Sequence, residues 1–282
     1  MSKKFLTILI AAAAMLFIGC DNDDDVVVID FAPAAPQGVY SVTGDNAVYV
    51  YFNGPYESDI DGYIIWRSLE EFTNYQDIGW VDAVANPNLD LLIYEYVDAS
   101  ARNGVTYFYA VSSVDEAGQV SELSAESVFD TPRPEGRVEL FDSSFSMNAA
   151  AFDFNYRVRV SALNEAADVV VDRDGFGFFY INAADILTDI QDVGYTDSFD
   201  EVGWSPVDGW SDIGFMEIIE GHTYVIWTND NHFAKMRVLA VGSNSVVFEW
   251  AYQTDEGNPE LKPVVPTAVK PEHGPDYLIK NF

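Results

Sequence analysis

The sequence NGVTYFYAVSSVDEAGQ, residues 103–119, holds the clearest structural signal in the chain. It begins with Asn-Gly, a pair that favours a tight turn because both residues tolerate a positive φ. A run rich in aromatic and β-branched residues follows, and Asp-Glu-Ala-Gly at residues 115–118 turns the chain again. Side chains of this kind fit the pleated surface of a sheet. We therefore predict a β-strand over residues 106–112.

Segments of the same character precede this strand, at residues 47–52, 63–67 and 92–98. Turn residues separate them, such as Asn-Gly-Pro at residues 53–55. Several short strands with turns between them are typical of a β-sandwich, in which alternate side chains of each strand are buried. We therefore predict a sandwich domain over residues 35–133.

This part of the chain resembles a fibronectin type III domain. The resemblance rests on GYIIWRS at residues 62–68, YVD at 96–98, NGVTYFYAV at 103–111, DEAG at 115–118 and SELS at 121–124. It implies a module that spaces or binds partners rather than one that performs chemistry, with Tyr107 as the tyrosine-corner residue. Tyr51 and Phe52 stand where the family often has a tryptophan, and we expect them to fill much of the same core volume.

Two tryptophans of this domain, Trp66 and Trp80, are candidates for stacking on a ligand. Tryptophan side chains are, however, highly buried on average in folded proteins. We therefore expect Trp66 to lie in the core of the sandwich or to shield it.

A short linker with Pro132, Pro134 and Gly136 separates the sandwich from a second β-rich domain, which we predict over residues 138–264. A Pro-containing tail, residues 265–282, follows it. The predicted fold class is therefore all-β: a fibronectin type III-like sandwich followed by a second β-rich domain.

The clearest part of the second domain is a predicted three-stranded meander at residues 222–228, 232–241 and 245–252. Successive side chains of a strand point to opposite faces. Along the middle strand, one face therefore carries Ala234, Met236, Val238 and Ala240, and the other carries Phe233, Lys235, Arg237 and Leu239. We also expect strands at residues 152–160 and 176–181 and a short helix at residues 183–190.

Three pieces of this domain resemble the C-terminal part of HmuY-like lipoproteins: GHTYVIWT at residues 221–228, NHFAKMRV at 231–238 and VFEWAYQ at 247–253. Known members of that family include haem binders. The register of the predicted hairpin places His222 about six residues from His232, roughly 20 Å along the sheet. Two axial ligands of one iron lie far closer than that, and His273 lies in the tail. We therefore do not expect haem bound by two histidines.

Two further groups of residues are candidate ligand sites. Asp168, Asp172 and Asp174, next to Gly175, offer the hard oxygen ligands that Ca²⁺ prefers, although an ordinary acidic turn has the same composition. Trp204 and Trp210 flank a loop and can stack on sugar rings or on a porphyrin, or can serve ordinary packing.

The N-terminus resembles that of a bacterial lipoprotein. A basic MSKK is followed by an apolar run at residues 5–18, about 21 Å as a helix, which is short for a bilayer core of about 30 Å. The run ends in LFIGC at residues 16–20, which resembles a lipobox. We therefore predict a signal peptide at residues 1–19, lipidation of Cys20 and an acidic tether at residues 20–34.

The sequence after Cys20, Asp-Asn-Asp-Asp-Asp, bears on location. An acidic run there resembles a surface-export signal of Bacteroidetes-type bacteria, whereas an aspartate directly after the cysteine resembles an inner-membrane retention signal of enteric-type bacteria. We expect a cell-envelope location at the outer membrane or cell surface rather than at the inner membrane.

Charge and cysteine content narrow the function. The formal net charge of −32 repels nucleic acid, whose binding requires lysine and arginine, so we expect no nucleic-acid partner. The single cysteine, Cys20, excludes an internal disulfide. The membrane is instead the expected partner, reached through the lipid anchor.

The sequence leaves three functions open. The first is a non-catalytic lipoprotein that binds a ligand, a protein or a glycan through the second domain. The second is a glycan-active enzyme, although carboxylates are so abundant that any pair can be imagined as acid and base. The third is a purely structural or adhesive envelope protein. We expect no catalytic residues and no resident cofactor, with calcium as the one candidate ion.

Overall fold

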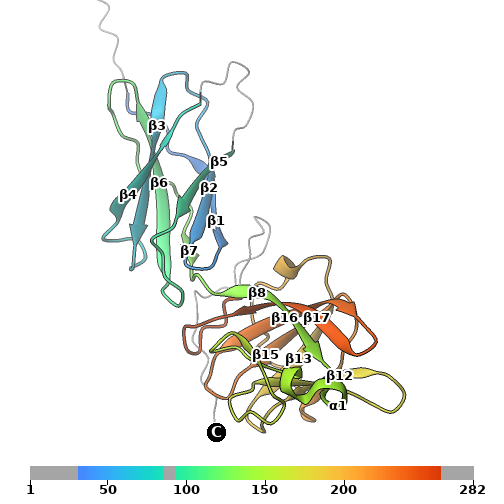
Figure 1. The fold of residues 1–282 in the computed structure, drawn as a ribbon. Coiled ribbons are helices and arrows are strands. Elements are labelled where there is room, and N and C mark those ends of the chain that lie inside the picture. Colours follow the sequence, from blue (N-terminus) through green and yellow to red (C-terminus); the bar gives the residue numbers. More distant parts are fainter. Residues whose placement is uncertain (1–30, 85–92, 262–282) are drawn as a thin grey trace, which may run out of the picture. The chain divides into compact units, whose positions relative to one another are not determined.

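The computed structural model describes residues 31–84 and 93–261, and they form an almost entirely antiparallel β-structure (Figure 1). This confirms the predicted all-β class. Cys20, the expected signal peptide, most of the tether and the tail lie outside the described residues. Within the described part, no helix is both long enough and apolar enough to cross a bilayer.

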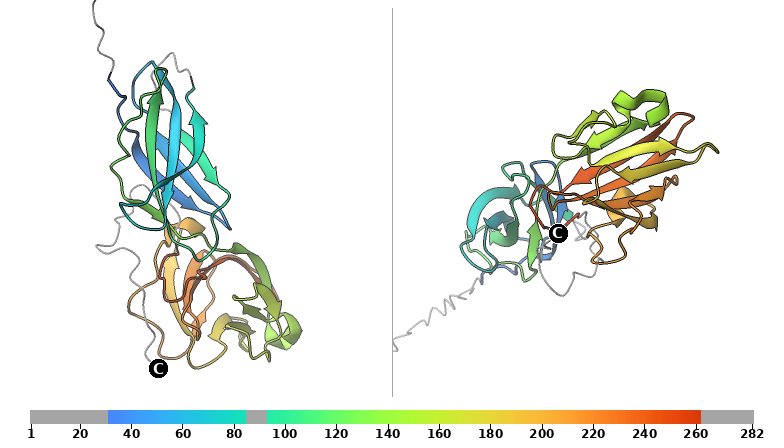
Figure 2. Two further views of the ribbon diagram at one scale, coloured as in Figure 1. Left: turned by 90° about the vertical axis from the view of Figure 1, so that its left-hand side faces the viewer. Right: turned by 90° about the horizontal axis from the view of Figure 1, so that it is seen from below.

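The first domain consists of two antiparallel sheets, as the resemblance to a fibronectin type III domain implied. The strands run roughly along one direction, as Figure 1 and the left panel of Figure 2 show. One sheet has the order β1 (Gln37–Thr43), β2 (Val48–Asn53), β5 (Ile93–Asp98). The other has the order β4 (Gln76–Asp82), β3 (Ile60–Ser68), β6 (Tyr107–Asp115), β7 (Val128–Asp130).

Strand β2 shows how the sequence selects the core of this domain. Val48, Val50 and Phe52 are fully buried, and the residues between them are half-buried. Phe52 packs edge-to-face on Tyr63, with 4.9 Å between the ring centroids. Tyr51 points to the opposite face and stacks on Tyr40, 5.1 Å away. The expectation that both Tyr51 and Phe52 fill the core was therefore wrong for Tyr51, since adjacent side chains cannot share a face.

A buried carboxylate, Asp98 at the end of β5, joins its own sheet to the other sheet of the sandwich. Its oxygens accept hydrogen bonds from Arg67 (2.7 Å), from the Tyr109 hydroxyl (2.8 Å) and from Ser100. Burial raises the pKa of Asp98, but these hydrogen bonds outweigh it and hold the pKa below its usual value.

The predicted role of Tyr107 is wrong. The hydroxyl that reaches back to the end of β5 belongs to Tyr109, two residues further along β6. Tyr107 instead packs in the core, with the Arg67 guanidinium 4.7 Å above its ring. Both tyrosines face inward, and Tyr109 is the one whose hydroxyl reaches Asp98.

We predict that Asp98→Ala lowers the free energy of unfolding by about 3 kcal/mol, because it leaves the Tyr109 hydroxyl and the Arg67 guanidinium without their acceptor. Denaturant unfolding followed by tryptophan fluorescence measures the change. Glu122→Ala, an exposed carboxylate in the same domain, is the control and should change stability by no more than about 0.5 kcal/mol. Equal effects of the two substitutions would contradict a structural role for Asp98.

The second domain has two five-stranded antiparallel sheets. The first has the order β10 (Val158–Val160), β9 (Ala151–Asp153), β11 (Val169–Arg173), β12 (Phe179–Ala183), β14 (Phe215–Glu217). The second has the order β13 (Asp189–Tyr195), β15 (His222–Trp227), β16 (Phe233–Val241), β17 (Ser245–Tyr252), β8 (Glu135–Phe141). Short helices are α1 (Ser143–Ser146) and two 3₁₀ turns, Met147–Ala149 and Phe199–Glu201.

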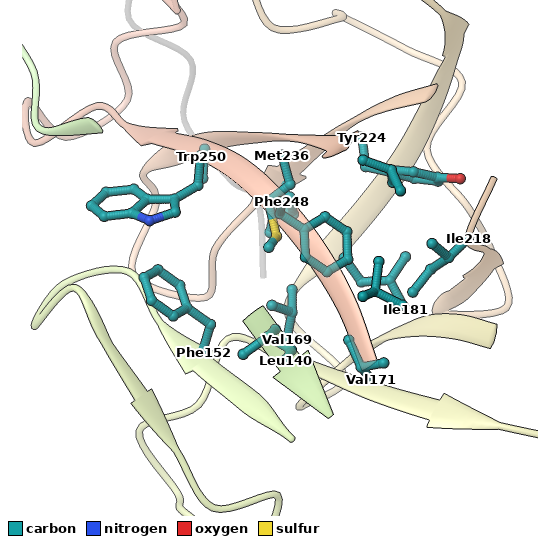
Figure 3. Packing of buried hydrophobic residues seen from close by; sticks show 14 of the residues in the cluster. Leu140, Phe152, Val169, Val171, Ile181, Ile218, Tyr224, Met236, Phe248 and Trp250 are labelled. Atoms are coloured by element: carbon teal, nitrogen blue, oxygen red, sulfur yellow. The ribbon is translucent and has the colours of Figure 1, made fainter. Parts of the chain in front are cut away.

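The core of this domain lies between the two sheets, where Phe152, Val169 and Ile181 of one face Met236, Phe248 and Trp250 of the other (Figure 3). The predicted meander is confirmed as β15, β16 and β17. Its alternation is confirmed as far as Val238, because Ala234, Met236 and Val238 belong to this core while Phe233 belongs to a smaller cluster elsewhere. It was wrong for Ala240, which follows a register shift in the pairing with β17 and lies outside the core.

Four local expectations differ from the structure. The expected strand at residues 176–181 begins only at Phe179, because Asp174 accepts hydrogen bonds from the backbone N–H groups of Phe176 and Phe178 and fixes a turn there. Residues 183–190 form no helix, because Asp185 accepts hydrogen bonds from the backbone N–H groups of Leu187 and Thr188 and so fixes a turn between β12 and β13. Residues 152–160 form a hairpin rather than one strand, β9 and β10. Gly136, assigned to the linker, lies within β8, where the Trp250 ring covers it.

Candidate ligand-binding site

A hollow of about 450 Å³ lies over strands β11, β12 and β14 of the second domain. Its wall consists of Asp172, Arg173, Asp174, Tyr180, Asn182 and Phe215. Its volume falls in the range of about 300–1,000 Å³ that is usual for small-molecule sites. Rings and polar groups together form the wall, so the hollow can contact an amphipathic ligand.

Alternation along the strands directs these side chains away from the core. Phe179 and Ile181 of β12 are buried in the core, so Tyr180 and Asn182 point to the opposite face. The antiparallel register places Asp172 of β11 opposite Tyr180, and Phe215 of β14 opposite Asn182. Paired residues of neighbouring strands share a face, and the four side chains therefore meet over one patch of sheet.

The two aromatic rings of the hollow form an edge-to-face pair. The ring centroids of Tyr180 and Phe215 are 5.8 Å apart, and the planes meet at 81°. This geometry is favourable for two aromatic side chains and holds each ring in place. Phe215 is 41% exposed, so a substantial part of its ring surface is open to a ligand.

Asp174 fixes the turn that joins β11 to β12. Its Oδ1 atom accepts hydrogen bonds from the backbone N–H groups of Phe176 and Phe178, both at 2.9 Å. Slight desolvation raises the pKa of Asp174, but the hydrogen bonds from Phe178, Phe176 and Gly177 outweigh it and hold the pKa below the usual value. Asp174 therefore remains a carboxylate at neutral pH.

Asp172 and Asn182 each keep one acceptor open. Asp172 Oδ1 accepts a hydrogen bond from the Ser143 hydroxyl, and the Asn182 amide nitrogen donates to the carbonyls of Val170 and Tyr180 at 3.3 and 3.4 Å. Within residues 31–84 and 93–261, Asp172 Oδ2 and Asn182 Oδ1 have no such partner. These two oxygens can accept hydrogen bonds from a ligand.

Arg173 does not offer its charge to the hollow. Its guanidinium pairs with the buried carboxylate of Asp142 at 3.3 Å and donates a hydrogen bond to the carbonyl of Ser243. It also lies 5.6 Å from the centre of the Phe179 ring, which belongs to the core. The charged groups that remain for a ligand are the carboxylates of Asp172 and Asp174.

The structure does not bring the three predicted calcium ligands together. Asp172 and Asp174 line the hollow, but Asp168 does not, and its Oδ2 accepts a hydrogen bond from the backbone N–H of Phe154 at 2.8 Å. Among the residues described, no group of three or more His, Cys, Asp or Glu side chains is arranged to hold a metal ion. The predicted three-aspartate calcium site is therefore not formed, because spacing along the chain did not reflect the partners of each carboxylate.

The two loop tryptophans have structural partners and do not line the hollow. Trp204 is half-buried and forms an antiparallel bridge with Glu260. Trp210 packs on Trp227 and Phe233, with ring centroids 5.6 and 6.4 Å away, in a small hydrophobic cluster outside the main core. The prediction of a stacking site at Trp204 and Trp210 is thus not supported, and ordinary packing accounts for Trp210.

The first-domain tryptophans lie on the outer face of their sheet. Trp66 shares that face with Ile64, is half-buried and is not part of the core cluster, so it does not lie in the core as one half of the prediction had it. Its indole N–H donates to Ser112 at 2.7 Å. Trp80 is 42% exposed, pairs with Ile64 and donates its N–H to Asp82.

The histidine register is as predicted. The His232 carbonyl accepts a hydrogen bond from the Thr228 N–H, and β15 and β16 pair from Trp227–Phe233 onward, with His222 at the far end of β15. His222 faces Asp192 at 3.0 Å and His232 faces Asp230 at 3.2 Å. His273 lies outside the described residues.

Comparisons with known proteins give limited matches. No family model matches the chain. It is 32% identical over 124 residues to an amylopullulanase of Thermoanaerobacterium saccharolyticum, which covers 44% of this chain and only 8% of that protein's length. An Fn3-like protein from Clostridium thermocellum has a TM-score of 0.29 at 24% identity, covering 38% of this chain and 100% of that chain. A DUF4466 family protein from Parabacteroides merdae has a TM-score of 0.43 at 12% identity, covering 80% and 95%. The resemblance to HmuY-like lipoproteins stays a prediction.

Sequence reasoning missed Tyr180, Asn182 and Phe215. Tyr180 and Asn182 could have been found from alternation in FFYINA, residues 178–183, once Phe179 and Ile181 were assigned to the core. Phe215 carries no local signal, because only the pairing of β14 with β12 brings it to the hollow.

Asp168 gives a pH-dependent prediction. Burial raises its pKa to about 7, against the hydrogen bond from Phe154, and neighbouring carboxylates raise it further. A folded-state pKa above the unfolded value means that the folded state binds the proton more tightly. The contribution of Asp168 to stability is therefore full below about pH 4 and is lost as the pH rises through about 7.

We predict that Asp168→Asn makes the free energy of unfolding fall less than in the wild-type protein between pH 4 and pH 8, by up to about 4 kcal/mol. Denaturant titrations at several pH values measure the difference between the two curves. Asp212→Asn, an exposed carboxylate, is the matched control and should follow the wild-type curve. If Asp168→Asn also follows it, the carboxyl group of Asp168 titrates normally and the prediction is wrong.

Proposed function

We propose that this chain is a lipid-anchored, non-catalytic cell-envelope protein that binds a ligand in the hollow of its second domain. The observation that carries the proposal is the hollow itself, with two open rings and unpaired oxygens on a rigid sheet. Rigid strands hold contact groups in place more accurately than loops do. The fibronectin type III-like first domain fits a spacing or adhesive role beside it.

The charge state of Asp174 favours binding over chemistry in the hollow. A glycosidase needs one carboxyl group that stays protonated, which requires a raised pKa. Asp174 has a lowered pKa because three backbone N–H groups stabilise its charge. Asp168, whose carboxyl group has a clearly raised pKa, does not line the hollow.

A glycan-active enzyme is the second candidate. It is favoured by the similarity to an amylopullulanase, whose name denotes a glycan-active enzyme, over 44% of this chain. Incubation of the purified protein with soluble polysaccharides, followed by measurement of new reducing ends, tests it. Release of reducing ends by the purified protein would overturn the non-catalytic proposal, and its loss in Tyr180→Ala would place that activity in the hollow.

The lipid anchor is proposed from residues 16–20, LFIGC. Two or more acyl chains give stable anchoring, since each buried methylene contributes about 0.8 kcal/mol. The acidic run after Cys20 supports an outer-membrane or cell-surface location.

We predict that Cys20→Ala moves the protein from the membrane fraction to the soluble fraction, because it removes the sulfur atom that carries the lipid. Fractionation and mass spectrometry of the N-terminal peptide measure the result. Asn22→Ala, two residues away, is the control and should remain on the membrane. An unmodified Cys20 thiol in the native protein would disprove the anchor.

We predict that Tyr180→Ala and Phe215→Ala each weaken ligand binding at least tenfold, about 1.4 kcal/mol, because each removes ring surface that the ligand covers. Calorimetric titration of the purified full chain, with ligands found on a glycan and metabolite array, measures the dissociation constants. Tyr195→Ala, an exposed tyrosine on β13 of the other sheet, is the control and should not alter binding. If neither substitution changes the affinity, the ligand binds outside the hollow.

A further inference from the structure

We infer that the hollow of the second domain recognises a neutral carbohydrate. This inference rests on the proposed function, since it names the chemical class of the ligand bound there. Three properties of the hollow support it: the rings, the surplus of acceptors and the absence of an available cation in its wall.

The rings fit the apolar face of a sugar. A pyranose presents C–H groups on one face and hydroxyls around its rim, so it needs the face of one apolar ring with polar groups beside it. Phe215, which is 41% exposed, can provide such a face, and its edge-to-face contact with Tyr180 at 5.8 Å fixes the ring. Asp172 and Asn182 lie opposite these rings in the strand register and so stand at the edge of that surface.

The free polar atoms of the hollow are acceptors, which suit a ligand with hydrogen-bond donors. Asp172 Oδ2 and Asn182 Oδ1 are acceptors without a partner among the described residues, while the Asn182 amide hydrogens are engaged by Val170 and Tyr180. Sugar hydroxyls donate hydrogen bonds readily, and a bond to a carboxylate is about twice as strong as one between neutral groups. The wall therefore favours the binding of a ligand that has several O–H donors.

Charge selects against acidic sugars. Asp172 and Asp174 both border the hollow, and the one cationic side chain in its wall, Arg173, is committed to Asp142. A uronate placed there would meet two carboxylates with no compensating cation. The chain's net charge of −32 adds a long-range repulsion in the same direction.

The test uses the full chain and five probes of equal length: maltohexaose, cellohexaose, xylohexaose, mannohexaose and hexagalacturonate. Calorimetric titrations are run in EDTA at 0.15 M salt, with circular dichroism of every variant to confirm folding. We expect at least one neutral hexasaccharide to bind and hexagalacturonate to bind at least tenfold more weakly. Phe215→Ala should weaken binding of the neutral probe at least tenfold.

Asp172→Asn sharpens the test because it keeps the shape of the side chain and the acceptor for Ser143 while it removes the charge. We expect this substitution to weaken binding of the neutral probe about tenfold, since a carboxylate acceptor is lost. We also expect it to reduce the difference in affinity between the neutral and the acidic probes. Tyr195→Ala should leave the dissociation constant of every probe unchanged.

Four results overturn the inference. Binding of hexagalacturonate as tight as that of the neutral probes removes the charge argument. If neither Phe215→Ala nor Asp172→Asn changes the affinity for the neutral probes, the sugar binds outside the hollow. If no hexasaccharide binds but a non-carbohydrate from the metabolite array binds in a Tyr180-dependent manner, the carbohydrate assignment fails while the proposed function stands. If nothing binds in that manner, both fail.

Discussion

The alternation of side chains along β12 is the constraint on which the candidate site depends. Phe179 and Ile181 must face the core, because each is buried against the opposite sheet. Side chains of a strand alternate between its two faces, so Tyr180 and Asn182 must face outward. The site is thus a direct consequence of the packing that stabilises the domain. A slip of one residue in the register of β12 would exchange the core residues for the site residues, and the burial of Phe179 and Ile181 excludes it.

Local patterns predicted much of the fold. The strands β2 and β6 and the meander β15–β17 were found because turn residues border them and alternation is clear. The hollow was not found, because it depends on pairing between distant segments. Phe215 reaches Asn182 only through β14, which is three residues long and has no pattern of its own. A short edge strand of this kind is placed by its neighbours rather than by its sequence.

Several differences in the first domain turned on which side chains share a face or reach a given partner. Tyr107 was expected to be the tyrosine-corner residue, yet both Tyr107 and Tyr109 face inward, and it is the Tyr109 hydroxyl that reaches Asp98. Trp66 was expected to lie in the core or to shield it, but Tyr63 and Ile65 occupy the inner face and Trp66 lies on the outer one. Size and hydrophobicity are weaker guides than position along the strand.

The three aspartates near β11 explain why an acid-rich sequence says little about chemistry by itself. Asp168 and Asp174 are six residues apart, yet burial raises the pKa of Asp168 to about 7 while backbone N–H groups lower that of Asp174. Asp172 accepts a hydrogen bond from the Ser143 hydroxyl and keeps one oxygen open. Three identical side chains therefore become a protonatable group, a turn anchor and a hydrogen-bond acceptor. The difference lies in their partners, which only the folded chain supplies. In a chain with 46 acidic residues, the informative carboxylates are those whose partners leave an oxygen unsatisfied beside exposed rings.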